Sequence, residues 1–305
     1  NEKKEKVRGI GRRFFQSRGF DFIKTPTVEY YETVGKASAI PDSSLFKLVD
    51  RQGETLVLRP DMTTPIVRVA TSKLLKEQIP LRLAYFANVF RAQEHEGGRP
   101  AEFEQMGVEL IGDDSVFADA EMIITASELV QELGINSYRL TVGHAGLLQS
   151  ILTQLTQSDQ QVRELRKLLV EKNMVGFEEA VRTFGLSNEE EQRFIEFIGQ
   201  ASNVQSIQQL RPFIDETNDS QVTMYSYLSE LSSLLENAGL AKLVTYDLTL
   251  TSEMSYYTGM LFEVFASGSG FAIGNGGRYD GLLQEFNSDV GATGFGLRVD
   301  RLLEV

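Results

Sequence analysis

Residues 103–111 place an amide, a glycine and a carboxylate at alternate positions of one predicted strand. Side chains two positions apart in a strand share a face, so Gln105, Gly107 and Glu109 point to the same side. Such a face can bind a polar ligand, because a buried carboxylate requires a cation or an N–H donor as its complement. It can equally be the solvent-facing side of an antiparallel sheet.

Three further segments carry polar side chains beside residues that shape the backbone. The first follows a predicted strand and contains Asp61 and Thr63, either of which can cap the next helix. Residues 274–281 are rich in glycine, which allows either close approach of a ligand or a tight turn. Tyr256 and Tyr257 precede another predicted strand, and half-buried aromatic side chains are the simplest interpretation of this pair.

Hydrophobic periodicity indicates the elements that position these segments. Helices are predicted from the first residues to about Gly19 and from a cap at Ser115 to Leu133. A flexible polar loop is predicted at 92–100. From about 145 to 240 apolar residues recur at helical spacing, which indicates a helical insertion. Strands are predicted at 20–25, 45–49, 55–58, 83–91, 103–111, 138–142, 243–251, 259–266 and 292–297. The pattern predicts an α+β core over residues 1–305 that the insertion interrupts.

Composition excludes several classes of function. The net charge of −13 opposes binding of phosphate backbones, so no nucleic-acid partner is expected. The absence of cysteine and the presence of only two histidines, His95 and His144, exclude thiolate chemistry and a His-rich metal site. We expect neither histidine to be catalytic, and we expect no metal and no cofactor. No apolar run reaches membrane-spanning length and no signal peptide is present, so a cytoplasmic protein without a membrane partner is expected.

In order and spacing, these segments resemble the class II histidyl-tRNA synthetase family along nearly the whole chain. The likeness is carried by residues 20–29 with Thr25-Pro26, Leu58-Arg59-Pro60-Asp61-Met62-Thr63, Phe90-Arg91 with Gly98-Arg99 and Glu102-Phe103-Glu104-Gln105, residues 276–282, and Gly294-Phe295-Gly296 through Asp300-Arg301-Leu302. The resemblance implies a class II synthetase-like antiparallel sheet flanked by helices. It also implies a self-dimer built through the first motif, residues 20–29.

The same resemblance implies a histidine pocket. The family holds histidine with an acid and a threonine, a glutamine and a glutamate on one strand, two tyrosines and an arginine. The corresponding histidine-binding residues here are Asp61, Thr63, Arg91, Gln105, Glu109, Tyr257 and Tyr279. Asp61 is one methylene shorter than the family's glutamate, and Arg91 is the candidate for holding the ligand carboxylate.

Other positions depart from the synthetase pattern. Ser252 stands where the family has its catalytic arginine, and losing that charge should cost orders of magnitude in rate. Glu253 adds a negative charge beside it. Pro100 and Ala101 replace a tyrosine and an arginine of the second motif, and Arg298 replaces a glycine that leaves room for ATP. We therefore expect no catalytic residue and no aminoacylation, and no anticodon-binding domain follows in this chain.

A histidine pocket without activation chemistry is similar to the regulatory subunits of ATP phosphoribosyltransferase, which are paralogues of the synthetase core. This resemblance implies a non-catalytic subunit that assembles with a short-form catalytic subunit in the first step of histidine biosynthesis. That subunit would be required for activity and would mediate feedback inhibition by L-histidine. Two alternatives are an active histidyl-tRNA synthetase and a synthetase-like protein with another acceptor.

Overall fold

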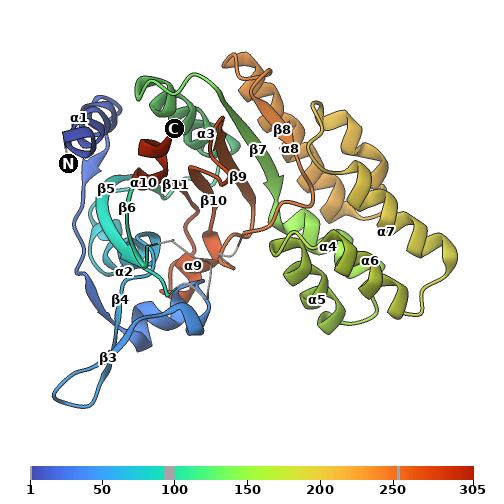
Figure 1. Cartoon of the computed structure of the whole chain (residues 1–305), viewed down its shortest axis with the longest axis horizontal. Coiled ribbons are helices and arrows are strands. Elements are labelled where there is room, and N and C mark those ends of the chain that lie inside the picture. Colours follow the sequence, from blue (N-terminus) through green and yellow to red (C-terminus); the bar gives the residue numbers. More distant parts are fainter. Residues whose placement is uncertain (1, 93–99, 253–254) are drawn as a thin grey trace. The chain divides into compact units, whose positions relative to one another are not determined.

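The chain folds into two compact units, which the computed structural model describes over residues 2–92, 100–252 and 255–305 (Figure 1). The first unit comprises Asn1–Tyr138, Met254–Tyr257 and Val264–Val305, and the second comprises Arg139–Glu253 and Thr258–Glu263. Most of the predicted loop at 92–100, including His95, lies outside the described residues.

Five strands of the first unit form a sheet in the order β1-β5-β6-β11-β10 (Figure 1). β5, β6, β11 and β10 are antiparallel neighbours, whereas β1 runs parallel to β5 at one edge. The bounds are Asp21–Phe22 for β1, Leu81–Phe90 for β5, Glu102–Ile111 for β6, Gly274–Arg278 for β10 and Ala292–Arg298 for β11. β9, Met260–Ala266, gives its last three residues to this unit.

Helices of the first unit pack apolar side chains against this sheet. In α1, Phe15 is fully buried, and its ring contacts those of Phe20, Phe86 and Phe295. Ser115 caps α3 by accepting a hydrogen bond from the Ala118 N–H at 3.3 Å, as predicted. The helices are α1 Glu2–Ser17, α2 Thr63–Ser72, α3 Val116–Glu132, α9 Asp280–Glu285 and α10 Val299–Glu304, with short turns at Tyr31–Gly35, Asp42–Ser44 and Leu74–Lys76.

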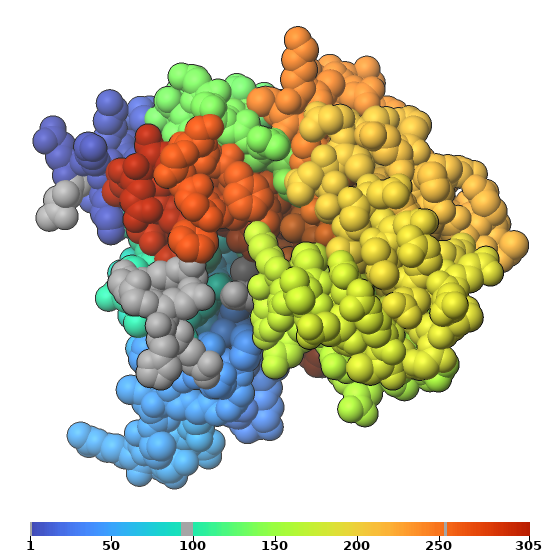
Figure 2. All heavy atoms as spheres, turned by 45° about the vertical axis from the view of Figure 1, so that its right-hand side comes forward, coloured from blue at the N-terminus to red at the C-terminus, as the bar shows by residue number. Residues whose placement is uncertain are grey.

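A second, three-stranded sheet belongs to the same unit. It consists of β2 Val28–Tyr30, β4 Thr55–Leu58 and β3 Lys47–Val49, all antiparallel, which confirms the predicted hairpin. The Asp50 carboxylate closes the turn by accepting hydrogen bonds from the N–H groups of residues 52 and 54, at 2.8 and 2.9 Å. This hairpin projects from the rest of the first unit (light blue in Figures 1 and 2).

The second unit is mostly helical, as the periodicity predicted for this part of the chain. Its strands β7, Tyr138–His144, and β8, Val244–Tyr246, pair in parallel, and the first four residues of β9 also belong to this unit. His144 caps α4 because its Nδ1 accepts a hydrogen bond from the Leu147 N–H at 3.1 Å. Burial lowers the pKa of His144 to about 4, so the ring is neutral. The helices are α4 Ala145–Leu155, α5 Asp159–Val170, α6 Met174–Thr183, α7 Asn188–Gln200 and α8 Asp219–Asn237, with a 3₁₀ segment at Ile207–Phe213.

Three predicted elements differ from the structure. Gly274–Arg278 is a strand, β10, where the sequence favoured a turn. The strand predicted at 20–25 is limited to Asp21–Phe22, and the one predicted at 243–251 is limited to Val244–Tyr246. In the part of the chain that the structure describes, no helix combines the length and the apolar character needed to cross a bilayer.

Candidate functional site

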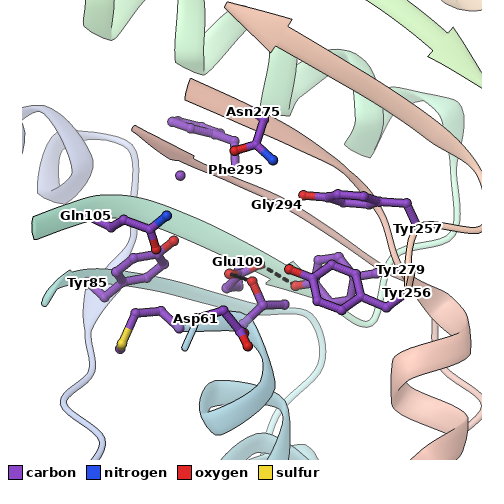
Figure 3. Close-up of a pocket in the computed structure, with 13 residues that line it drawn as sticks. Asp61, Tyr85, Gln105, Glu109, Tyr256, Tyr257, Asn275, Tyr279, Gly294 and Phe295 are labelled. Atoms are coloured by element: carbon purple, nitrogen blue, oxygen red, sulfur yellow. Dashed lines mark hydrogen bonds between the residues drawn. The ribbon is translucent and has the colours of Figure 1, made fainter. Parts of the chain in front are cut away.

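A cavity opens on one face of the five-stranded sheet in the first unit (Figure 3). Its empty space is about 300 Å³, a figure that includes the open solvent at its mouth. Its lining consists of Asp61, Met62, Thr63, Tyr85, Gln105, Glu109, Tyr256, Tyr257, Asn275, Tyr279, Gly294, Phe295 and Gly296. The polar and aromatic character of this lining suits a small ligand that carries several hydrogen-bonding groups.

Strand register explains the floor of the cavity. Tyr85 pairs with Gly107, Gly107 with Gly296, and Gly296 with Asn275, which makes one row across four strands. Directly paired residues lie on the same face of a sheet, so Tyr85 and Asn275 stand on either side of two glycines. A Cβ atom at Gly107 would lie 2.6 Å from the Tyr85 hydroxyl. Glycine is therefore required at this position for the Tyr85 ring to lie across the floor of the cavity.

Glu109 makes one end of the cavity acidic. Its side chain is 1% exposed, its Oε1 accepts a hydrogen bond from the Thr63 hydroxyl at 2.8 Å, and its Oε2 accepts one from the Tyr279 hydroxyl. Burial raises the pKa of Glu109 to about 8, the hydrogen bonds from Tyr279 and Thr63 oppose that shift, and the charge of Asp61 adds to it. A ligand that brings a cation or an N–H donor would favour the ionised carboxylate.

Asp61 provides a second buried carboxylate. Its Oδ1 accepts a hydrogen bond from the Thr64 N–H at 2.7 Å, in the first turn of α2, although the N-cap residue of that helix is Met62 and not the predicted Asp61 or Thr63. Its Oδ2 accepts hydrogen bonds from the hydroxyls of Thr64 and Ser38, both at 3.2 Å. Burial raises the pKa of Asp61. Because two buried carboxylates lie in one cavity, the cavity favours a ligand that carries a positive charge or N–H donors.

Three tyrosine rings form an aromatic wall. Tyr256 meets Tyr257 edge-on with ring centroids 5.0 Å apart, and it meets Tyr279 edge-on at 5.8 Å. Burial raises the pKa of all three hydroxyls, which therefore stay neutral and able to donate. Figure 3 shows the hydroxyls of Tyr256 and Tyr279 beside Glu109. This wall can flank a flat heteroaromatic ring and hydrogen-bond to its edge.

The cavity brings together six of the seven residues predicted to bind histidine: Asp61, Thr63, Gln105, Glu109, Tyr257 and Tyr279. The seventh, Arg91, is outside the lining, and its Nε donates to the Pro60 carbonyl at 2.8 Å. The charge of Arg91 nevertheless opposes the rise in the pKa of Asp61 that burial causes, so Arg91 adds positive potential to the site. Tyr85, Tyr256 and Asn275 also line the cavity, although the sequence did not predict them as histidine-binding residues.

The positions that depart from the synthetase pattern lie in different places. Arg298 pairs with Gln105 across β11 and β6, and its guanidinium lies 3.6 Å from the centroid of the Phe103 ring. Its Nη2 also forms an ion pair with Asp300 at 2.9 Å. Ser252 belongs to the second unit, and Glu253 lies outside the described residues. Among the described residues, no group of three histidine, aspartate or glutamate side chains is placed to hold a metal ion.

Comparison with known proteins identifies the family. The sequence model for histidyl-tRNA synthetase matches residues 1–302. The ATP phosphoribosyltransferase regulatory subunit of Lysinibacillus sphaericus is 62% identical over 303 residues, covering 99% of this chain and 77% of the relative. The regulatory subunit of Bacillus subtilis is 47% identical with the same coverage. A crystal structure described as an ATP phosphoribosyltransferase regulatory subunit/histidyl-tRNA synthetase from Bacillus halodurans is 42% identical, with a TM-score of 0.92 over 99% of this chain and 79% of that one.

The fold agrees with this likeness, because an antiparallel sheet flanked by helices carries the cavity in the first unit. The class II synthetase-like fold expected from the sequence is confirmed. This chain belongs to the family of ATP phosphoribosyltransferase regulatory subunits, whose fold is that of the histidyl-tRNA synthetase core.

Proposed function

We propose that this chain is a non-catalytic subunit that binds L-histidine in the cavity of the first unit and regulates a short-form ATP phosphoribosyltransferase. The catalytic subunit requires it for activity and is feedback-inhibited through it. The observation that carries the proposal is the environment of Glu109, a buried carboxylate held by Thr63 and Tyr279 beside an aromatic wall.

Histidine satisfies this environment group by group. One imidazole nitrogen faces Glu109, and a tyrosine hydroxyl of the wall serves the other, since a neutral imidazole has one donor and one acceptor. The α-ammonium group faces Asp61 and the oxygen of Gln105, which line the same cavity. A ligand without nitrogen donors would give neither acid a further hydrogen bond, at a cost of the order of 1–3 kcal/mol for each hydrogen bond that histidine would form.

Two features favour regulation over aminoacylation. Ser252 supplies no positive charge where an adenylate-forming enzyme would stabilise developing negative charge. The Arg298 guanidinium lies 3.6 Å from the centroid of the Phe103 ring, so it occupies a face of that ring on which a nucleotide base would otherwise stack. The proposed chemistry is therefore binding alone, with histidine shifting an equilibrium between two states of the assembly.

Such a shift requires that histidine bind one state better than the other. Couplings of this kind typically amount to ~1–3 kcal/mol, which corresponds to roughly 5- to 150-fold in affinity. Because the ligand binds the folded chain, histidine should also raise the free energy of unfolding, by about 2.7 kcal/mol at a hundredfold excess over its Kd.

The deciding experiment combines this chain with a short-form ATP phosphoribosyltransferase catalytic subunit and measures activity with and without histidine. We expect activity only in the mixture, inhibition by histidine, and relief of inhibition in Glu109→Ala. Calorimetry on the wild-type assembly should show histidine binding, and its absence would refute the proposal. Histidine-dependent ATP–pyrophosphate exchange addresses the rival function, since measurable exchange would indicate an active synthetase.

We also propose that the chain forms a dimer with a second copy next to the first motif. Tyr30 on β2 and Leu48 on β3 both pair with Leu56 on β4, so the three share one face of the small sheet. Tyr30 is 55% exposed and Leu48 is 44% exposed, and Val28 on the same face is 44% exposed. An exposed row of apolar side chains on a projecting sheet fits a self-association surface.

Sedimentation of the purified chain tests the dimer. We expect the wild type to sediment as a dimer and Tyr30→Glu to sediment as a monomer, because a carboxylate in an apolar interface is costly. Phe117→Glu is a matched control, since Phe117 is 62% exposed on α3 and is not part of this sheet. A monomeric wild type would contradict this part of the proposal.

A further inference from the structure

We propose that Asn275 binds the α-carboxylate of the amino-acid ligand, at the end of the row that runs from Tyr85 across Gly107 and Gly296. This inference rests on the proposed histidine-binding function and adds a residue to the ligand site. It is drawn from the register of β5, β6, β11 and β10 and from the position of the acidic side chains in the cavity.

The register places the Asn275 side chain on the face of the sheet that carries the cavity. Asn275 pairs with Gly296, Gly296 with Gly107, and Gly107 with Tyr85, so all four share a face. Because the two central residues lack side chains, the Tyr85 hydroxyl lies over both of them, 2.6 and 2.9 Å from the positions that Cβ atoms of Gly107 and Gly296 would take. Neighbouring strands are ~4.8 Å apart, which separates the backbones of the outer two strands by about 14 Å. Both outer side chains line the cavity.

The cavity is acidic at the end where Glu109 lies, whereas Arg298, at the other end, is already paired with Asp300. One row along, Glu109 pairs with Gly294, and one row the other way Gln105 pairs with Arg298. Successive rows are two residues apart, which is about 6.6 Å along a strand. An imidazole held at Glu109 therefore directs the backbone of the amino acid toward the row of Asn275. The ligand carboxylate is repelled by Glu109 and Asp61, which favours a position away from both acids.

Asn275 has the donor that the carboxylate needs. Its side-chain amide offers two N–H groups, and it forms no hydrogen bond with any residue in the described ranges. Figure 3 shows this amide directed into the cavity from the side opposite Asp61, near the Tyr257 hydroxyl. A polar side chain that is free of protein partners and faces two buried acids is placed to hold the opposite end of a zwitterion.

Calorimetry with two ligands tests this role. Histidine carries the carboxylate, and histidinol replaces it with a neutral alcohol while keeping the ring and the ammonium group. We expect Asn275→Ala to weaken histidine binding by about 10-fold or more, the range for a hydrogen bond to a charged group, and to change histidinol binding by less than about twofold. Asn275→Asp should weaken histidine further, through like-charge repulsion, and should not weaken histidinol.

Two control variants separate the possible results. Glu109→Gln should weaken both ligands alike, because both carry the imidazole. Asn237→Ala, at an exposed position at the end of α8, should change neither. Equal loss of histidine and histidinol in Asn275→Ala, or no loss of either, would overturn the role of Asn275 alone. A wild-type chain that binds neither ligand would overturn the proposed function together with this inference.

Discussion

Gly294 and Glu109 lie directly opposite each other on β11 and β6, and a Cβ atom at Gly294 would lie 2.1 Å from Oε2 of Glu109. Gly294→Ala should therefore displace the carboxylate, weaken histidine binding at least 10-fold, and lower the free energy of unfolding by ~1–3 kcal/mol through overpacking. Calorimetry and urea unfolding measure the two effects.

Gly199→Ala is the control for that variant. Gly199 lies in α7, and no atom lies within 4 Å of the Cβ it would acquire. Alanine in a helix should stabilise the chain by about 0.5–1 kcal/mol and leave histidine binding unchanged. Wild-type affinity in Gly294→Ala would show that the carboxylate of Glu109 does not contact the ligand.

The proton on Glu109 should make stability depend on pH. Burial raises its pKa from 4.5 to about 8 in the folded chain. Because the folded state holds this proton more tightly, the stabilisation is complete below pH 4.5 and is lost as the pH rises through about 8. Glu109→Gln cannot lose a proton there, so its free energy of unfolding should fall less between pH 6 and 9. Equal slopes for the two proteins in chemical unfolding would contradict this prediction.

Histidine binding should be linked to the same proton. An N–H donor at Glu109 favours the carboxylate, so binding releases a proton and tightens between pH 7 and 8.5, above the titration of free imidazole near 6.5. Calorimetry in buffers of different ionisation enthalpy measures the proton release directly. Glu109→Gln should show none, and release of the same size in that variant would assign the proton to another group.

Arg278 and Asp119 form the most enclosed ion pair of the first unit among those described, with Nε and Oδ2 2.8 Å apart and side-chain exposures of 8% and 0%. Arg278 also donates to the carbonyls of Asp113 and Ser115, which joins β10 to the start of α3. Asp119→Ala should lower the free energy of unfolding in urea by about 3–5 kcal/mol, since it removes the fully buried member of the two carboxylates that pair with Arg278. Glu216→Ala, which breaks an exposed pair with Arg211, should produce no measurable change.

Arg298 should exclude nucleotides. Its guanidinium covers the Phe103 ring, and Arg298→Gly would uncover that ring. We expect no ATP binding by the wild type in equilibrium dialysis and weak binding by Arg298→Gly. Pyrophosphate exchange should remain absent in both, because Ser252 is unchanged. Arg298→Lys, which keeps the charge without the planar stack, tests whether charge alone is sufficient to exclude ATP.

The sequence predicted the strands of the first unit well where side chains alternate. Residues 103–111 form β6 as expected, and the mixed face that could have met solvent lines the cavity instead. β10 was missed because Gly274, Gly276 and Gly277 lower the strand propensity of that segment. The segment is nevertheless a strand, since β11 supplies its backbone hydrogen bonds.

The candidate site was predicted only where a motif carried it. Glu109 and Gln105 are four residues apart on one strand, and strand side chains alternate between two faces, so the sequence alone predicts that both lie on the same face. Tyr85 and Asn275 have no such local signal, because only the pairing of β5, β6, β11 and β10 brings them to one row. Ser38 reaches Asp61 from a loop, and loop geometry of this kind has no sequence periodicity.

The chain crosses between the two units on either side of the tyrosine pair that lines the cavity. Tyr256 and Tyr257 belong to the first unit, whereas Ser252 before them and Thr258 after them belong to the helical second unit. Two of the three tyrosines of the aromatic wall thus lie on a segment that the chain enters from the helical unit and leaves to return to it. A ligand that orders these two tyrosines would therefore order a segment whose ends both continue into the helical unit.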